Sequence, residues 1–546
     1  MTYLSDWYDQ YNQFCATMQE GFFSSQGSLA VLTPVPATQY ALAALPILIV
    51  IGLMIGLRWN AQRAGLSGWL AGIGIGTLAF GLTFEVFFIS QVKGLLLSAF
   101  VLAVLWPALL LYNVVLQAGG IRAIAIALER LIADRGLRLI VVAWAFSGML
   151  EGLAGFGLPI AIVAPMLVQL GVSPVAAVAA VAVGHAWSVT LGDMGIIFQT
   201  LVVVTRIDGA ALIPGVALML GVACLGYGLS AALILHQGRR WRAVLGLAIL
   251  MAVTQYVLAS IGLTSLAAFG AGLMGMLGGT LIGRAPRRDV ETTVPGPPLA
   301  MQDCRPLISA LISYGSLAAL MTAIILIRPL YDALSALVWR IDFAEVVTRT
   351  GVITPAGPGQ VFRPLVHPGT TILLIAILSY LLFRRIGLSA ARDWRPIAAG
   401  TWQTAAPASA GIVAMIGLST IMEHCGMTTL LAQGMSIALG GVFPIVSPLV
   451  GMLGAFATGS NNNSNVLFAP LQQTAAVMLS ISPPVLIAAQ TTGGALGSMI
   501  APAKIVFGCS TVGLKGMDGD VLRMTLPYGL LMGLGIGLLT LAVSRL

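Results

Sequence analysis

The sequence predicts an all-α integral membrane protein with about 12 full spans, two re-entrant hairpins and broken helices, arranged as two inverted repeats. Composition is the first observation: of 546 residues, 58% are hydrophobic and 8% are charged, which is typical of polytopic membrane proteins. Second, many uninterrupted apolar runs are long enough to cross a bilayer. Third, two further apolar regions, 139–205 and 443–515, are interrupted by Gly, Pro, Asn and Ser.

Charge and cysteine usage exclude several classes of protein and site. The net charge of +8 comes mainly from arginines in loops, which suits a cytoplasmic face beside anionic lipid. No long basic and aromatic stretch accompanies it, so nucleic acid is not an expected partner. The five cysteines include no CxxC pair and the four histidines stand far apart, so we expect no disulfide framework, metal site or other cofactor. The first 57 residues carry no Lys or Arg and lack the basic start of a signal peptide.

The apolar runs and the arginines between them predict the order and orientation of the spans. The runs cover residues 40–57, 66–88, 94–117, 211–235, 243–262, 264–283, 305–327, 369–387, 396–422 and 521–544. Arginine clusters at 58–63, 122–138, 239–242, 284–305 and 384–395 mark the cytoplasmic side. These clusters agree with one another if the N-terminus is extracytoplasmic and region 139–205 crosses the membrane once. Residues 328–368 then lie outside, with a short interfacial helix over Trp339–Val347 and loop near 354–368.

An internal repeat supports this division. Ser173-Pro174 aligns without gaps with Ser482-Pro483, and small apolar residues match downstream. Each half contains a short amphipathic or polar segment (120–136 and 426–440), a broken hairpin, a broken span and a final span. The first segment carries Arg and the second carries no charge, so equivalent elements should have opposite orientations. The expected domains are an N-terminal extracytoplasmic segment (1–39), the first repeat (40–242), connector spans with a cytoplasmic linker (243–304) and the second repeat (305–546).

The most unusual stretch reads Thr458-Gly-Ser-Asn-Asn-Asn-Ser-Asn465 and lies in an apolar region. Between Gly426 and Ala503 there is no Asp, Glu, Lys or Arg. An Asn amide needs partners that hydrocarbon lacks, so the cluster favours the tip of a re-entrant hairpin that faces a polar cavity. The alternative is an ordinary loop between two membrane helices.

The first broken region combines helix-breaking residues with acids. Glu151 precedes Gly155, Gly157 and Pro159, and a helix N-terminus near Pro159 would offer N–H groups suited to a carboxylate. The alternative is a Gly/Pro kink that serves helix packing. The following span is interrupted over residues 184–193, and Asp193 is the last residue of this break. An acid inside the membrane usually handles ions or protons, so Glu151 and Asp193 are the proton-coupling candidates, with His185 close in sequence.

The matching break in the second half lies over residues 491–504 and includes Pro502 and Lys504. Lys504 could counter an anionic substrate or could extend to a membrane interface, and the sequence leaves both readings open. Gly72-Ile-Gly74-Ile-Gly76 lies within an apolar run, where small residues allow close helix contact rather than nucleotide binding. No Walker motif and no nucleophile–base arrangement is present, which argues against ATP-driven pumping and against an enzyme.

These motifs resemble those of the lactate permease family of secondary transporters over most of the chain. The matching pieces are Glu151-Gly152, Ala154–Gly157 and Pro159, then Thr458–Ser460, Ser464-Asn465, Leu467-Phe468, Leu471-Gln472, Thr491–Gly494, Met499-Ile500 and Pro502. The resemblance implies proton-coupled uptake of L-lactate, D-lactate or glycolate across a bacterial inner membrane. A wider resemblance to anion transporters with paired hairpins implies a scaffold and a transport domain and is compatible with a homodimer and elevator motion.

The chain also departs from the pattern of that family. Asn461 stands where an acid is usual, Leu158 replaces a Thr, and Ser498 replaces a Lys that has its nearest counterpart at Lys504. His185 and Asp193 stand where Asn and a small residue are expected. These departures suggest that the proton route has moved to Asp193 or Glu151 and that the substrate could be another small carboxylate.

We therefore expect the hairpin tips and the span breaks to meet near mid-membrane and bind a monocarboxylate. The expected substrate-binding residues are Gly155, Phe156, Gly157, His185, Ser188, Ser460, Asn461, Asn462, Asn463, Ser464, Asn465, Thr491, Thr492 and Lys504. Glu151 or Asp193 would carry the coupled proton, and the proton gradient would supply the energy. Na⁺ coupling is the alternative, because uncharged side chains and carbonyls can also hold Na⁺. The sequence leaves open the identity of the carboxylate, the oligomeric state and whether the motion is of the elevator or rocking kind.

Overall fold

The computed structural model describes residues 36–57, 59–153, 155, 157–283, 304–388, 393–514 and 517–545. It confirms the all-α class: within these ranges, twelve helices are long and apolar enough to cross a membrane. Residues 1–35 of the predicted N-terminal segment, the predicted linker at 284–303 and Phe156 lie outside the described residues.

The first half of the chain holds three long helices, a hairpin, a broken span and three further spans. The helices before the broken span are α2 (Ala37–Gly56), α3 (Ala61–Ala79), α4 (Phe84–Gln117), α5 (Gly120–Leu131), α6 (Arg135–Ile140), the π-helix η1 (Val141–Phe146), α7 (Ser147–Leu153) and α8 (Leu158–Gln169). The broken span and its successors are α9 (Pro174–Gly184), η2 (Ala186–Ser188), η3 (Asp193–Gly195), α10 (Ile196–Thr205), α11 (Gly209–Ile234), η4 (Gly238–Arg240), α12 (Trp241–Ser260) and α13 (Thr264–Gly283).

The second half repeats the hairpin and the broken span. It begins with α14 (Arg305–Leu326), α15 (Arg328–Ser335), β1 (Asp342–Phe343), β2 (Val346–Val347), β3 (Ile353–Thr354), β4 (Gly357–Pro358), α16 (Pro368–Arg385) and α17 (Arg395–His424). It continues with α18 (Met427–Leu439), η6 (Gly440–Val442), α19 (Phe443–Thr458), α20 (Asn461–Met478), α21 (Pro483–Met499), α22 (Pro502–Thr511) and α23 (Asp518–Val543).

Glycines in left-handed backbone make the two hairpin turns. Gly157 (φ 86°) precedes α8, and Gly459 (φ 69°) ends α19. Glycine populates this region without the steric penalty of a Cβ atom. After Gly459, the Ser460 hydroxyl accepts a hydrogen bond from the backbone N–H of Asn463 (3.3 Å) and caps α20. The predicted hairpins at 155–159 and 460–465 are therefore present, and the asparagines form the first turns of α20.

Equivalent elements of the two halves exchange partners, which is the packing expected of an inverted repeat. The later part of the first broken span, α10, packs against α20, the returning arm of the second hairpin. Correspondingly, α22 packs against α8, the returning arm of the first hairpin. The division of residues 40–242 and 305–546 into domains stays a prediction.

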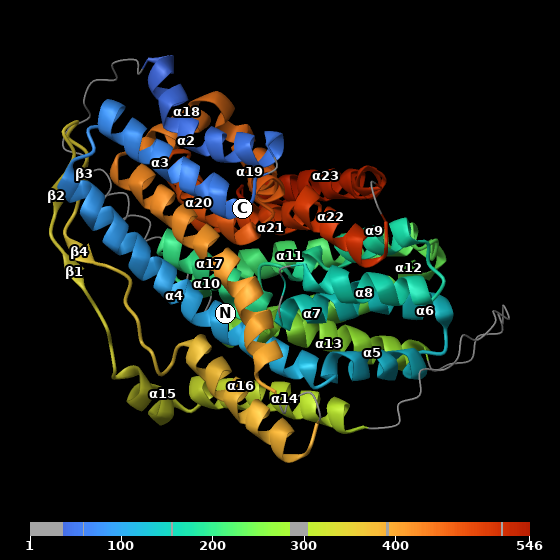
Figure 1. Cartoon of the computed structure of the whole chain (residues 1–546). Coiled ribbons are helices and arrows are strands. Elements are labelled where there is room, and N and C mark those ends of the chain that lie inside the picture. The colour runs from blue at the N-terminus through green and yellow to red at the C-terminus, as the bar shows by residue number, and fades with distance from the viewer. Residues whose placement is uncertain are drawn as a thin grey trace, which may run out of the picture.

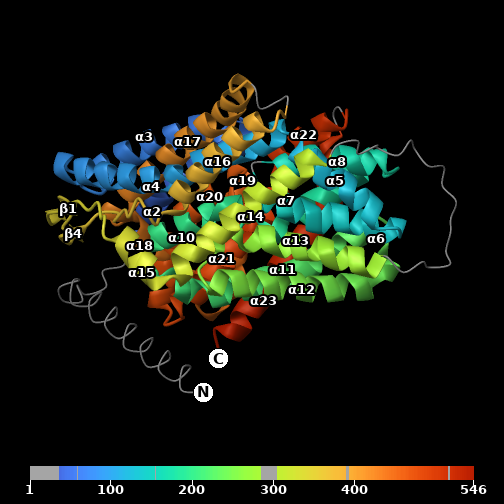
Figure 2. The same ribbon diagram turned by 90° about the horizontal axis from the view of Figure 1, so that it is seen from below.

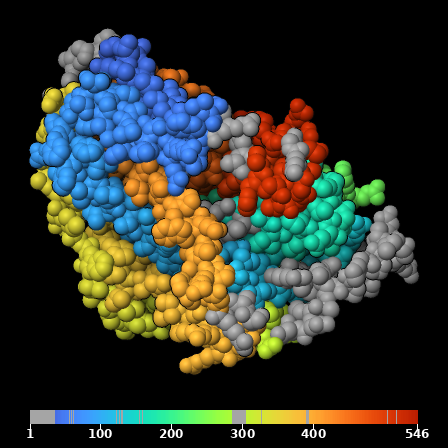
Figure 3. All heavy atoms as spheres, viewed as in Figure 1, coloured from blue at the N-terminus to red at the C-terminus, as the bar shows by residue number. Residues whose placement is uncertain are grey.

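The helices extend between two ends of the molecule, and different connecting segments lie at each end (Figures 1 and 2). The strands lie at one end, and α6 lies at the other. Figure 3 shows α2–α4 in blue and the orange residues near 400 on one side of the visible face, with teal and red residues of both broken regions on the other. This agrees with the packing of α17 against α3 and α4.

Two sequence predictions were wrong in detail. The predicted run 66–88 is split, since α3 ends at Ala79 and Glu85 lies in the first turn of α4. Residues Trp339–Val347 form no helix: β1 pairs with β4 and β2 with β3, both antiparallel. Their β-branched residues and the Gly351 turn (φ 87°) favour strand pairing. The interruption at Ile500 and Ala501 lies within the predicted break at 491–504, although residues 491–499 are still helical.

Glycines in the second broken region allow close backbone contact rather than unwinding. A Cβ atom at Gly493 would lie 1.8 Å from the carbonyl oxygen of Pro448, and one at Gly497 would lie 2.2 Å from that of Met452. On the facing helix, a Cβ atom at Gly451 would lie 2.1 Å from the carbonyl oxygen of Gln490. Helices α19 and α21 therefore meet through backbone atoms, as small residues permit in membranes.

This contact predicts that Gly493→Ala destabilises the folded protein by about 1–3 kcal/mol, because the added methyl group overpacks the α19–α21 contact. The matched control is Gly246→Ala on α12, where a Cβ atom would meet nothing within 4 Å. The measurement is the fraction of detergent-solubilised protein that stays monodisperse in size-exclusion chromatography after heating. Equal midpoint temperatures for the two variants would contradict the assignment.

Candidate functional site

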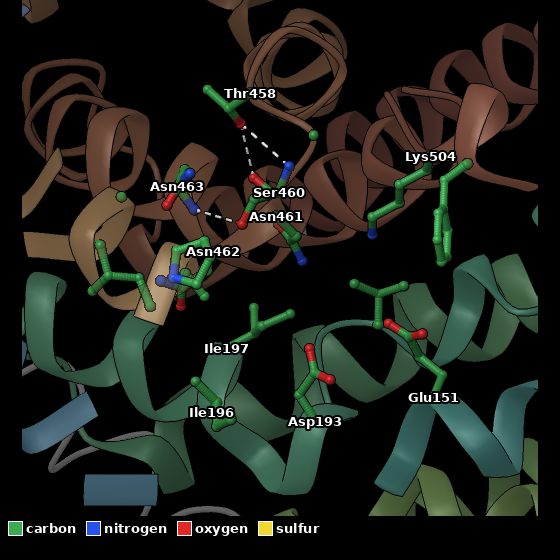
Figure 4. Close-up of a pocket in the computed structure, with 17 residues that line it drawn as sticks. Glu151, Asp193, Ile196, Ile197, Thr458, Ser460, Asn461, Asn462, Asn463 and Lys504 are labelled. Carbon is green, nitrogen blue, oxygen red and sulfur yellow. Dashed lines mark hydrogen bonds between the residues drawn. The ribbon is translucent and has the colours of Figure 1, made fainter. Parts of the chain in front are cut away.

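A cavity of about 300 Å³ lies where the second hairpin tip meets the break of the first broken span. Figure 4 shows its polar side chains, with Lys504 and the asparagines on one side and Glu151 and Asp193 on the other. The polar or tip residues that line it are Glu151, Asp193, Thr458, Gly459, Ser460, Asn461, Asn462, Asn463 and Lys504. Both halves of the chain therefore contribute side chains to one cavity.

The two acids lie close together in this cavity. Both are buried, with 1% of Glu151 and 5% of Asp193 exposed. A Cβ atom on Gly155 would lie 2.5 Å from Oε1 of Glu151 and 2.6 Å from Oδ1 of Asp193, so these two oxygens are within about 5 Å of each other. Gly155 donates its backbone N–H to Oδ1 of Asp193. Only a residue without a Cβ atom fits between the two carboxylates, which explains Gly155.

The local backbone aims Asp193 into the cavity. Asp193 (φ 51°) and Met194 (φ 53°) both adopt a left-handed backbone conformation, which residues other than Gly rarely do. Such strain is retained where the surroundings fix the conformation, and it is common at functional sites. Here it turns the chain between η2 and α10 and places the carboxylate beside the first hairpin tip.

Lys504 supplies the cation of the cavity. It lies in the first turn of α22 and is partly buried. None of the salt bridges found among the described residues includes it. Its ammonium group points across the cavity toward the two acids (Figure 4). Of the two readings of Lys504, this position agrees with a cation that faces an anionic ligand.

A chain of hydrogen bonds joins the hairpin tip to the span break. Asn461 donates through Nδ2 to Thr190 Oγ1 (3.0 Å), and Thr190 donates to the Thr491 carbonyl (3.1 Å). Asn465 donates through Nδ2 to Thr491 Oγ1 (2.9 Å). Thr190 was missed from the sequence, although a hydroxyl between His185 and Asp193 in a predicted break was the available signal.

Several predicted binding residues lie behind the cavity wall rather than on it. His185, Ser188, Ser464, Asn465, Thr491 and Thr492 are all fully buried, and none of them lines the cavity. Ser188 donates to the His185 carbonyl (2.6 Å) and Ser464 to the Gly451 carbonyl (2.8 Å), so both hydroxyls serve the local backbone. Gly155 and Gly157 shape the first hairpin tip.

The remaining residues that line the cavity are apolar, and no feature of the sequence singled them out. These residues are Val189, Ile196, Ile197, Phe507 and, from α17, Pro407, Ala408, Gly411 and Ile412. The α17 residues belong to an ordinary apolar span. Only the fold brings them to the hairpin tip, which is why they were missed.

Some polar atoms of the site have no partner within the described part of the chain. The amide atoms Nδ2 and Oδ1 of Asn462 are both buried without a hydrogen bond, and so is Oδ1 of Asn461. Buried polar groups are normally paired, so unpaired ones in a cavity point to a ligand or to water. Among the described residues, no three His, Cys, Asp or Glu side chains gather as metal ligands would.

Comparisons with known proteins show the family to which the chain belongs. The model of the L-lactate permease family matches residues 39–546. An L-lactate permease of Bacillus subtilis (strain 168) is 26% identical over 92% of this chain and 95% of its own. The glycolate permease GlcA of Escherichia coli (strain K12) is 27% identical over 91% and 94%. Among solved structures, the Alcanivorax borkumensis YdaH transporter matches with a TM-score of 0.47 and 18% identity over 83% of this chain and 87% of that chain. The family match covers nearly the whole chain and confirms the resemblance seen in the sequence motifs, so this chain belongs to the L-lactate permease family and is a multi-pass membrane transporter rather than an enzyme.

Proposed function

We propose that this transporter takes up small 2-hydroxymonocarboxylates (L-lactate, D-lactate and glycolate) across the bacterial inner membrane by proton symport and alternating access. The observation that carries the proposal is the single cavity that combines Lys504, Asn462 and the acid pair Glu151 and Asp193. The names of the relatives, L-lactate permease and glycolate permease, support the same substrate class. A volume of about 300 Å³ is at the small end of ligand pockets, which suits a small solute.

Each part of such a substrate has a chemical counterpart in the cavity. The carboxylate would face Lys504 and the N-terminus of α20, which begins at Asn461 and presents the positive end of the helix dipole. The hydroxyl would bond to the amide of Asn462, whose donor and acceptor are both unpaired. The methyl group of lactate would lie against the apolar wall that includes Ile197 and Ile412.

Electrostatics couples the anion to a proton in this proposal. Two carboxylates within about 5 Å of each other in a buried site repel strongly, and Lys504 can offset only one negative charge. A substrate anion adds another negative charge, which a proton on Glu151 or Asp193 would cancel. Anion and proton binding therefore favour each other, which is the thermodynamic basis of symport.

The first test is uptake of labelled L-lactate into proteoliposomes with an imposed pH gradient and no Na⁺. We expect accumulation above the external concentration, because inward proton flow would drive the anion uphill. A protonophore should abolish it. Uptake that merely equilibrates would indicate a channel and would contradict the proposal.

Na⁺ coupling to another small carboxylate remains the second candidate, and one observation favours it. Oδ1 of Asn461, Oδ1 of Asn465 and Oγ1 of Thr492 are buried without partners in the described residues, and neutral oxygens of this kind bind Na⁺. Replacing external Na⁺ with choline at constant pH separates the candidates. Proton symport predicts unchanged uptake, whereas Na⁺ coupling predicts its loss.

Variants of the cavity test the assignment of residues. Asn462→Ala and Asn463→Ala should each raise the KM for L-lactate about tenfold, the cost of one lost hydrogen bond to a charged ligand. Asp193→Asn should abolish accumulation driven by the pH gradient, because Glu151 alone then balances Lys504 and the anion can bind without a proton. The control is Asp332→Asn on α15, where the side chain is 58% exposed. Wild-type transport in all three cavity variants at normal expression would rule out this site.

A further inference from the structure

We propose that His185 holds the coupled proton on Glu151 and is not a substrate ligand. The proposal deepens the proposed symport and rests on it. It assigns to His185 the role of a positioning residue, which acts on the substrate only through the protonation of Glu151. This differs from the substrate-binding role expected from the sequence.

The ring of His185 is fixed from behind by its own helix. His185 is fully buried at the C-terminal end of α9, and it does not line the cavity. Nδ1 hydrogen-bonds to the carbonyl oxygen of Val181. Because a carbonyl only accepts, the hydrogen-bond network assigns the ring proton to Nδ1. A neutral ring in this tautomer leaves Nε2 as a bare acceptor.

That acceptor faces one oxygen of Glu151. Nε2 lies 3.8 Å from Oε2 of Glu151, and neither atom has a hydrogen-bond partner in the described residues. The other oxygen, Oε1, is the one near Gly155 and Asp193. One oxygen of the Glu151 carboxyl group, Oε1, therefore faces Asp193 and the cavity, and the other, Oε2, faces His185.

This geometry distinguishes the two protonation states of Glu151. When Glu151 is ionised and the ring is neutral, Oε2 and Nε2 are both acceptors and no hydrogen bond can form between them. A proton on Oε2 converts the pair into donor and acceptor, and a small side-chain movement closes the gap to a hydrogen bond. His185 therefore stabilises the protonated carboxyl group, the state in which the carrier would be loaded with its proton.

The charged surroundings of His185 come from few elements. Glu151 on α7 lies 3.8 Å from its ring, and Asp193 on η3 and Lys504 on α22 line the cavity together with Glu151. Helix α11, which packs against η2, carries Cys224 and Tyr227, while η1, α8 and α21 carry no Asp, Glu, Lys, Arg or His. The charged residues of α23 (Asp518, Asp520 and Arg523) lie in its first two turns. Within the described residues, Glu151 is the only acid within salt-bridge distance of His185.

The test compares three variants in proteoliposomes whose external pH is varied from about 5.5 to about 8.5, a range in which lactate stays ionised. His185→Leu removes the acceptor, and His185→Gln keeps a weaker one. Ser188→Ala is the matched control, because it removes the hydroxyl that bonds to the His185 carbonyl in the same buried turn and leaves the ring in place. Two quantities are measured: the external pH of half-maximal L-lactate uptake, and the KM for lactate–lactate exchange at the acid end of the range.

We expect His185→Leu to lower the pH of half-maximal uptake by about one unit, which is a tenfold loss of proton affinity. His185→Gln should shift it in the same direction by about half a unit, and Ser188→Ala should not shift it. The KM for exchange at acid pH should stay at the wild-type value in all three variants, since protons are then in excess and the substrate site is intact.

Two results would overturn the proposal. An unshifted pH profile in His185→Leu would show that His185 does not hold the proton, and if that variant fails to reach the membrane, an unshifted profile in His185→Gln decides the matter. A raised KM for exchange with an unshifted pH profile would return His185 to the substrate site. A wild-type protein whose uptake shows no dependence on the pH gradient would instead refute proton symport itself.

Discussion

Glu151 and Asp193 place two carboxylates within about 5 Å of each other inside a helix bundle, one on the first hairpin and one in the break of the following span. Gly155 donates an N–H to Asp193 and Lys504 faces the pair, and both reduce the repulsion between the two acids. The positive φ angles of Asp193 and Met194 are part of the same arrangement, since they turn the acid inward. A cation from the second repeat and acids from the first make the cavity dependent on both halves of the chain.

The amide side of the cavity is held by packing that leaves Asn462 free. Beneath it, Gln472 donates to the Ser447 carbonyl (3.0 Å) and Gln490 donates to Ser464 Oγ (3.1 Å), so the polar groups of α19, α20 and α21 satisfy one another. Glycines let α19 and α21 touch through their backbones. A tip supported in this way presents its unpaired amide with little conformational freedom, which lowers the entropic cost of ligand binding.

The sequence predicted the site well where a residue type has one structural explanation, and less well where it has two. Acids and asparagines inside an apolar region pointed to Glu151, Asp193 and Asn461–Asn463, and all of these line the cavity. Glycine can either break a helix or allow close packing, and Gly493 and Gly497 do the latter, so the interruption within the predicted break at 491–504 comes only at Ile500. The direction of side chains in an irregular break follows no fixed period, which is why His185, Ser188 and Thr190 could not be oriented. The strands at 342–358 pair with one another around the Gly351 turn, which the sequence prediction of a helix and a loop overlooked. The α17 wall depends on the fold.

The central claim, that anion and proton bind together in this cavity, is tested most directly by calorimetric titration of L-lactate into the purified protein. Repeating the titration in buffers of different ionisation enthalpy gives the number of protons taken up with each lactate. This account predicts net proton uptake approaching one per lactate in the wild type and none in Glu151→Gln combined with Asp193→Asn. Binding of lactate by the wild type without any proton uptake at neutral pH would contradict it.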